Sequence, residues 1–246
     1  MDSSHPEFLL EQELQWWISV WDPVFRSGKF WNPDVPELLN TVSQSEVSYE
    51  ERRWMEAKAQ VIRVLKEAQI GDRDFFKDKI VMEIGPGPVG FLEACEARVA
   101  VGIEPLANAF RRQGLLLPGS DVVYLNTPAE TIPLVDDFVD ITVSRNSLDH
   151  VAEPEKVVDE IWRVLKPNGF FLLNVDIEHE KRPLEPHSFS LAQIDHLVCR
   201  FRIDREIVYE KSHGGEGKMY VALCVKPAED CSGGSASKKP HIVGQS

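Results

Sequence analysis

Three glycines and one glutamate have the spacing in this sequence that most directly suggests chemistry. Gly85, Gly87 and Gly90 follow a short apolar run and precede a stretch that can begin a helix. Glycines at such a turn let the backbone bend tightly and let a ligand approach without a Cβ in the way. Glu104 lies 19 positions after Gly85, where an acidic side chain can accept hydrogen bonds from both hydroxyls of a ribose. The pattern predicts a site for a nucleoside-containing ligand, and by itself it describes a dinucleotide site equally well.

A second set of residues could move protons. Asp149 and His150 follow a predicted strand, where a carboxylate or an imidazole could act as general base toward a hydroxyl or a protonated amine. The competing interpretations are an N-cap or turn role for Asp149 and a structural hydrogen bond for His150. His187 belongs to a long polar segment, residues 176–189, and long loops at a ligand edge usually carry function. We expect His187 either to contact a substrate or to be a capping or surface residue.

The elements that must position these residues form an alternating pattern from Lys79 onward. Short β-branched runs alternate with helical stretches, which predicts βαβ units and a parallel sheet buried on both faces. The predicted strands cover residues 80–84, 99–104, 121–125, 139–144, 170–175, 201–210 and 218–226, and the predicted helices cover 90–96, 106–113 and 154–165. The fold class is therefore α/β: a Rossmann-like, seven-stranded, mostly parallel sheet with an antiparallel edge hairpin and helices on both faces.

Two amphipathic helices are expected before the sheet. The first covers residues 7–21 and ends at Asp22-Pro23, and the second covers residues 48–70 with Ser48 and Glu51 as a capping box. Four prolines predict irregular structure between them. The predicted domains are a helical extension at residues 1–78, an α/β domain at 79–227 and a disordered Gly/Ser/Lys-rich tail at 228–246.

Three segments in order carry a family resemblance. Glu83-Ile84-Gly85-Pro86-Gly87, Val101-Gly102-Ile103-Glu104 and Leu165-Lys166-Pro167-Asn168-Gly169-Phe170-Phe171 resemble the motifs of class I S-adenosylmethionine-dependent methyltransferases, in particular small-molecule enzymes of the methyltransferase type 11 kind. The L-K-P-x-G turn is the most telling, because dinucleotide dehydrogenases have no habitual counterpart. The resemblance covers about residues 79 to 176 and implies S-adenosyl-L-methionine as cofactor. Val89 stands where the family usually has its third glycine, and we expect it to press on the ligand and weaken binding modestly.

The resemblance also implies roles for single residues. Glu83, Gly85 and Gly87 would border the methionine portion of the cofactor, Glu104 would hold the ribose, and Glu130 would accept from the adenine amine. The aromatic N-terminal helices resemble a lid over the substrate cleft, although packing against the sheet explains them equally well. The cofactor-binding set is Glu83, Gly85, Gly87, Gly90, Glu104, Pro105, Ala129, Glu130, Asn146 and Ser147, and the candidate catalytic residues are Asp149, His150 and His187.

The charge and residue composition limit the classes of molecule that this protein is expected to bind. The formal net charge of −13 argues against a nucleic-acid partner, whose phosphates would call for Lys and Arg. A neutral or cationic small-molecule acceptor fits better, and the aromatic residues suit a hydrophobic or aromatic one. The four cysteines form no C-x-x-C pair, so we predict neither a metal site nor a disulfide framework. No apolar run approaches the roughly 20 residues of a membrane span, and no signal peptide is recognised, so a cytoplasmic protein is expected.

Two other functions remain as alternatives. A nicotinamide-dependent oxidoreductase would need a tyrosine or lysine proton donor, and no Y-x-x-x-K spacing follows the fourth strand. A non-catalytic protein that keeps the fold as a binding or scaffolding module is left open by Val89 and by the short predicted helix at residues 90–96. A nucleic-acid or protein methyltransferase has less support, because the sequence has no N-P-P-Y-type motif and no basic stripe.

Overall fold

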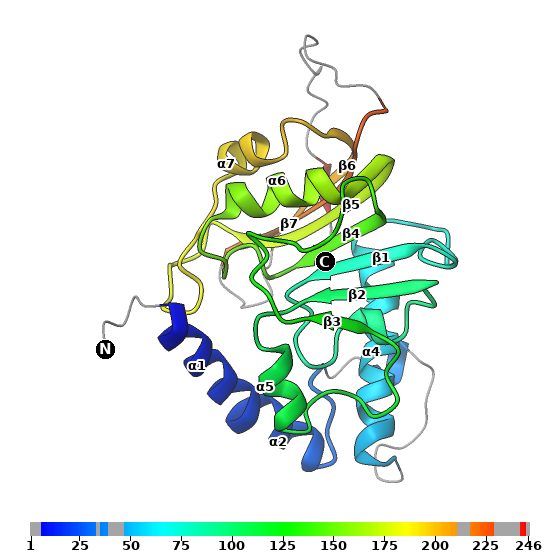
Figure 1. Ribbon diagram of the computed structural model, residues 1–246, viewed down its shortest axis with the longest axis vertical. Helices are drawn as coiled ribbons and strands as arrows, with labels where there is room; N and C mark the ends of the chain where they lie inside the picture. Colours follow the sequence, from blue (N-terminus) through cyan, green and yellow to red (C-terminus); the bar gives the residue numbers. More distant parts are fainter. Residues whose placement is uncertain (1–5, 33–34, 39–46, 211–216, 229–241, 245–246) are drawn as a thin grey trace.

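The centre of the molecule is one β-sheet (Figure 1). The structure is a computed structural model, and it describes residues 6–32, 35–38, 47–210, 217–228 and 242–244. The strand order is β3-β2-β1-β4-β5-β7-β6-β8. The seven predicted strands are present, and the short β8 is additional. Their bounds are β1 (Ile80–Ile84), β2 (Val99–Ile103), β3 (Val123–Leu125), β4 (Val139–Arg145), β5 (Leu165–Ile177), β6 (Arg202–Tyr209), β7 (Lys218–Val225) and β8 (Ile242–Gly244).

Strand direction decides where the candidate residues meet. The five strands from β3 to β5 pair in parallel, whereas β7 is antiparallel to both β5 and β6. The carboxyl ends of β1, β2, β4 and β5 therefore lie along one edge of the sheet. The glycine turn, Glu104 and the segment 145–150 all follow strands at that edge, which is where open α/β sheets bind ligands.

Apolar side chains on both faces of the strands form the core. Met82 and Ile84 pack in one cluster with residues of α6 (Pro154–Val164) and α7 (Leu191–Leu197). Val81, which alternates with them, packs in a second cluster with residues of α4 (Tyr49–Glu67) on the opposite face. Burial on both faces explains why these strands are continuous apolar runs.

Helix α4 begins where the sequence predicts. The side chain of Ser48 accepts from the N–H of Glu51, and the side chain of Glu51 accepts from the N–H of Ser48. This capping box satisfies two N–H groups that the first turn would otherwise leave without partners. The prediction of a capped helix is confirmed, and the helix ends at Glu67, three residues earlier than expected.

The predicted helix at residues 90–96 is wrong. Only the 3₁₀ turn η3 (Phe91–Glu93) forms, and Glu96 has a φ of 56°, which a right-handed helix cannot contain. Phe91 and Leu92 pack in one cluster with Val64 and Leu65 of α4. Helix α4 thus buries Phe91 and Leu92, which the predicted helix at residues 90–96 was expected to carry on its apolar face.

The N-terminal helix does not end at Asp22-Pro23 as predicted. Helix α1 (Pro6–Trp16) continues through a π-helical turn, η1 (Trp17–Trp21), into α2 (Asp22–Arg26). Pro23 is tolerated because it lies in the first turn of α2, where its missing N–H is not needed. A short helix, α3 (Val35–Leu38), follows in the stretch that was expected to be irregular. Figure 1 shows α1 and α2 beside α5 (Ala107–Arg112), below the strand ends.

The C-terminal segment from residue 228, expected to be disordered, is described only in part. Within it, β8 pairs in parallel with β6, and residues 229–241 and 245–246 lie outside the described part of the chain. None of the helices in the described residues combines the length and the apolar character that a membrane crossing requires.

Candidate active site

The glycine turn after β1 adopts the conformation that requires glycine. Gly85 has a φ of 60° and Gly87 a φ of 65°, both in the left-handed region. The N–H of Gly85 donates to the carbonyl of Ile103 at 2.9 Å, so the turn continues the pairing of β1 with β2. A Cβ on Gly85 would lie 2.9 Å from the Cβ of Ser147. The turn after β1 is therefore packed directly against the segment after β4.

Gly90 is needed for a different reason. A Cβ at this position would lie 2.6 Å from Oε2 of Glu83, whose residue is only 3% exposed. Burial raises the pKa of Glu83 to about 8, against the opposing effect of the Arg145 charge. Oε2 of Glu83 has no hydrogen-bond partner. Gly90 thus leaves room for the buried carboxyl group of Glu83, one oxygen of which has no hydrogen-bond partner.

Val89, which stands where a third glycine was expected, packs against the N-terminal helices. Its side chain is buried in a cluster with Trp21, Phe25 and Ala57 of the N-terminal helices. The residue at this position therefore anchors the extension to the turn, and the expected weakening of ligand binding stays a prediction.

Glu104 connects the ends of β1 and β2. Its Oε2 accepts from the N–H of Gly87 at 3.1 Å and its Oε1 from the N–H of Leu106 at 2.9 Å. The residue is 4% exposed, and burial, with a further contribution from the charge of Glu13 in α1, raises its pKa to about 8. The carboxyl group thus joins the glycine turn to the segment after β2, and its contact with a ribose stays a prediction. Pro105 follows directly and is half-buried.

The loop after β3 contacts the start of α6. Ala129 is 5% exposed. Oε1 of Glu130 accepts from the N–H groups of Ala152 at 2.8 Å and Glu153 at 3.1 Å, which are the residue before the N-cap and the N-cap residue of α6. This contact was not predicted. The contact of Glu130 with an adenine amine stays a prediction.

Polar atoms without partners gather after β4. Asn146 has a φ of 45°, its N–H donates to the carbonyl of Asn174 at 2.8 Å, and its buried Oδ1 has no partner. The buried Nε of Arg145 also has none. Ser147 Oγ lies 2.9 Å from Ser144 Oγ. Asparagine is among the few residues that tolerate a left-handed backbone, which explains why it occupies this position.

The three candidate catalytic residues lie close together in the fold. The side chain of Asp149 is 1% exposed, that of His150 is 27% exposed, and His150 Nε2 is 3.9 Å from Asp149 Oδ2. Burial raises the pKa of Asp149, and the charge of His150 opposes this effect. Asp149 is not an N-cap, because Glu153 holds that position on α6. His187 Nε2 lies 2.9 Å from the carbonyl oxygen of Val151, and its ring stacks on Phe189.

Trp17 lies against the glycine turn, a contact that was not predicted from the sequence. A Cβ on Gly87 would lie 2.9 Å from Cη2 of Trp17, so the indole ring lies against the glycine turn. Trp17 also contacts Phe110 of α5, with ring centroids 5.9 Å apart. The aromatic spacing of residues 14–21 indicates an apolar helix face but contains no signal for its contact with residue 87.

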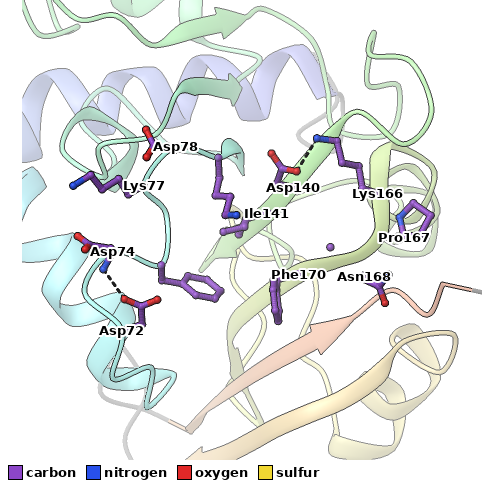
Figure 2. Close-up of a pocket in the computed structure, with 13 residues that line it drawn as sticks. Asp72, Asp74, Lys77, Asp78, Asp140, Ile141, Lys166, Pro167, Asn168 and Phe170 are labelled. Carbon is purple, nitrogen blue, oxygen red and sulfur yellow. Dashed lines mark hydrogen bonds and ion pairs between the residues drawn. The ribbon is translucent and has the colours of Figure 1, made fainter.

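The L-K-P-N-G turn lies away from this edge. It forms the beginning of β5, and Figure 2 shows Lys166, Pro167 and Asn168 around a cavity of about 750 Å³ together with residues that precede β1. Lys166 Nζ pairs with Asp140 at 2.6 Å, and Asp140 also accepts from the N–H of Ile80. The motif that is most telling for the family thus ties the amino-terminal ends of β1, β4 and β5 together and does not contact the candidate ligand site.

Comparisons with known proteins agree with this geometry. Residues 82–173 match the family described as the methyltransferase domain. An uncharacterized methyltransferase of Mycobacterium bovis is 31% identical over 101 residues, and one of Mycobacterium tuberculosis is 30% identical over the same length. Each match covers 40% of this chain and 40% of the relative, so only part of those proteins is represented by the similarity.

Solved structures show the same fold. The S-adenosylmethionine-dependent methyltransferase of Methanosarcina mazei is 20% identical, with a TM-score of 0.51 over 62% of this chain and 94% of that one. The YcgJ protein of Bacillus subtilis is 15% identical, with a TM-score of 0.51 over 69% and 99%. Residues 82–173 of this chain therefore match a methyltransferase domain, and the α/β sheet around them has the fold of S-adenosylmethionine-dependent methyltransferases.

Proposed function

We propose that this chain transfers a methyl group from S-adenosyl-L-methionine to a small-molecule acceptor. The observation that carries the proposal is a set of buried polar atoms without partners where β1 and β4 end: Glu83 Oε2, Arg145 Nε and Asn146 Oδ1. Buried polar groups in proteins are normally hydrogen-bonded, so an open set at the ligand edge supports a polar ligand that completes it. The methionine part of the cofactor carries an ammonium and a carboxylate, which suit an acid and a guanidinium.

The residues also fit the ribose end of the cofactor. Each oxygen of Glu104 accepts one N–H, and a carboxylate oxygen can accept two, so capacity remains for two hydroxyls. Gly85 and Gly87 present backbone without side chains at the same place. When bound, S-adenosyl-L-methionine supplies a methyl group that its sulfonium has already activated.

The chain's own residues then have two tasks, alignment and exclusion of water. His150 is accessible and lies next to the buried Asp149, so it can accept a proton from a hydroxyl or a protonated amine. The aromatic residues of the N-terminal segment supply an apolar cover, which supports a hydrophobic acceptor. With a net charge of −13, the chain favours a neutral or cationic acceptor over an anionic one.

The N-terminal segment acts in this proposal as a lid. Helix α2 is held by polar contacts, because Asp22 bonds both Arg26 and Tyr49, and Arg52 Nε donates to the carbonyl of Phe25. Helix α1 is held by apolar contacts, with Leu14 packed against Phe110. A ligand against Gly87 requires the indole of Trp17 to move, and the π-helical turn between α1 and α2 is where the chain can bend.

One observation favours a second candidate function. Trp17 lies against Gly87, and the carboxyl group of Glu104 already accepts from two N–H groups. The protein's own groups thus occupy this part of the sheet edge, which is compatible with a non-catalytic scaffold that binds no cofactor. Calorimetry with S-adenosylhomocysteine separates the two. The enzyme proposal expects the wild type and Trp17→Ala to bind and Glu104→Ala to bind at least tenfold more weakly. If the folded wild type and the folded Trp17→Ala variant both fail to bind, the methyltransferase proposal is overturned and the scaffold remains.

A further inference from the structure

Three side chains that could bind a metal converge beyond the ends of β4 and β5. Asp149, His179 and Glu185 each offer one ligand atom, and the three atoms lie within 4.8 Å of one another. A cation placed among them is then at most about 2.8 Å from each atom, whereas bonds to such ligands are about 2.0–2.2 Å. Shifts of less than an ångström, which side chains make by small rotations, would close the site.

Two of the three side chains are buried and have ring or carboxylate atoms without a hydrogen-bond partner. The side chain of Asp149 is 1% exposed and neither carboxylate oxygen has a hydrogen-bond partner. The side chain of His179 is 3% exposed and its Nε2 has none. An unpartnered buried carboxylate is costly in free energy, and such groups in proteins are normally paired or bound to a metal. The two groups therefore point to a missing positive partner.

One nitrogen of the His179 imidazole, Nδ1, already has a carbonyl partner and lies 4.0 Å from Glu185 Oε2. Its Nδ1 lies 2.9 Å from the carbonyl oxygen of Glu180, and the carbonyl of His179 itself accepts from Ser188 Oγ at 2.6 Å. A histidine that binds a metal through one nitrogen usually donates the other N–H to a carbonyl or carboxylate, which fixes the tautomer. With Nδ1 as donor to Glu180, the lone pair is on the unpartnered Nε2.

The surrounding charges neither fill nor block the site. Arg182 contacts Glu185 Oε2 at 3.3 Å, but its side chain is 41% exposed. His150 Nε2 is 3.9 Å from Asp149, too far for a hydrogen bond. The loop that carries His179 and Glu185 is held in place by the N–H of His187, which donates to the carbonyl of Asp149 at 3.3 Å. The ligand set is thus brought together by backbone contacts that do not depend on a cation.

We propose that Asp149, His179 and Glu185 bind one divalent cation, of the Mn²⁺ or Zn²⁺ type, beside the acceptor face of the domain. One imidazole and two carboxylates suit these ions better than Mg²⁺ or Ca²⁺, which prefer oxygen ligands alone. The site would join the long loop after β5 to the end of β4. It does not rest on the proposed function, because cation binding needs no cofactor.

The test uses the full chain freed of metals by chelation and then titrated with Mn²⁺, read by electron paramagnetic resonance of the free ion. Manganese is chosen because it binds thiols poorly, so the cysteines do not contribute. We expect one ion per chain and a rise of roughly 5–10 °C in Tm at saturation. Asp149→Asn, His179→Gln and Glu185→Gln should each weaken Mn²⁺ binding at least tenfold, with native circular dichroism.

Glu180→Gln is the matched control, because it removes one negative charge from the same loop but no ligand. It should bind Mn²⁺ as the wild type does. The proposal is overturned if the wild type binds no Mn²⁺, if the three ligand variants keep wild-type affinity, or if Glu180→Gln loses as much affinity as they do, since general attraction to an acidic chain would then be the cause. A ligand variant that fails to fold is replaced by Glu185→Ala, whose side chain is 23% exposed and whose loss the fold should tolerate.

Discussion

Two buried carboxylates at the same sheet edge have opposite environments. Glu104, after β2, accepts from two backbone N–H groups and is buried, with Glu13 of α1 near enough to affect its pKa. Asp149, after β4, is at least as buried and its two oxygens accept from no group in the described residues. The carboxyl group of Glu104 stabilises the turn by accepting from backbone N–H groups, whereas the carboxyl group of Asp149 makes no hydrogen bond with the residues around it. A group of the second kind indicates a ligand more strongly than a group of the first.

The largest expected effect extends the comparison to a third buried carboxyl group at this edge, Glu83, and is a pH dependence of stability. The folded pKa of Glu83 is about 8, against an ordinary value of 4.5, so the folded state holds the proton more tightly. Its stabilising effect is complete below about pH 4.5 and is lost as pH rises through 8. Chemical denaturation should show the wild type losing on the order of 4–5 kcal/mol more than Glu83→Gln between pH 4.5 and 8.5. Parallel pH profiles would show that Glu83 is charged in the native state.

Exchanging each carboxylate for its amide compares the two environments directly. Glu104→Gln places an amide N–H₂ against one of the two backbone N–H groups from which the carboxyl group accepts, so we expect a loss of about 2–3 kcal/mol in the free energy of unfolding. Asp149→Asn, in metal-free protein, should be at least as stable as the wild type, because no hydrogen bond is lost. Urea unfolding measures both. Equal losses in the two variants would contradict the distinction drawn here.

Gly90→Ala tests how closely the turn is built around Glu83. Its Cβ would meet Glu83 Oε2 at 2.6 Å and the carbonyl oxygen of Pro86 at 3.0 Å, so we expect a loss of about 2 kcal/mol. Gly71→Ala is the control, because nothing lies within 4 Å of that Cβ. Thermal unfolding of the two variants gives the result. A Gly90→Ala variant as stable as Gly71→Ala would mean that Glu83 can move aside freely.

The smallest effect concerns the cover over Glu104. Trp17→Ala frees the face of Gly87, so S-adenosylhomocysteine should bind about tenfold more tightly, equivalent to about 1.4 kcal/mol. Trp31→Ala should leave the affinity unchanged, because Trp31 is 39% exposed and contacts Trp16 at the outer side of the cluster. Calorimetry decides. Weaker binding by Trp17→Ala would mean that the indole packs on the ligand instead of displacing it.

Several parts of the fold and of the candidate site could be predicted from the sequence. The strand pattern, the capping box at Ser48 and Glu51 and the placement of Glu104 beside the glycine turn depend on residues close in the sequence or on one strand period. The predicted helix at 90–96 failed because α4, more than 20 residues earlier, packs against Phe91 and Leu92. The predicted end of the first helix failed because proline is acceptable in the first turn of α2.

The amino-acid sequence alone determined the order of the strands along the chain and the resemblance of residues 82–173 to a methyltransferase domain, because local periodicity and short motifs carry that information. Only the tertiary structure placed Trp17 on Gly87, turned Val89 toward the N-terminal helices and brought His179 and Glu185 to Asp149. These contacts join residues between 30 and 70 positions apart. Their partners are chosen by the packing of helices and loops on the sheet, and no local pattern of residues encodes that choice.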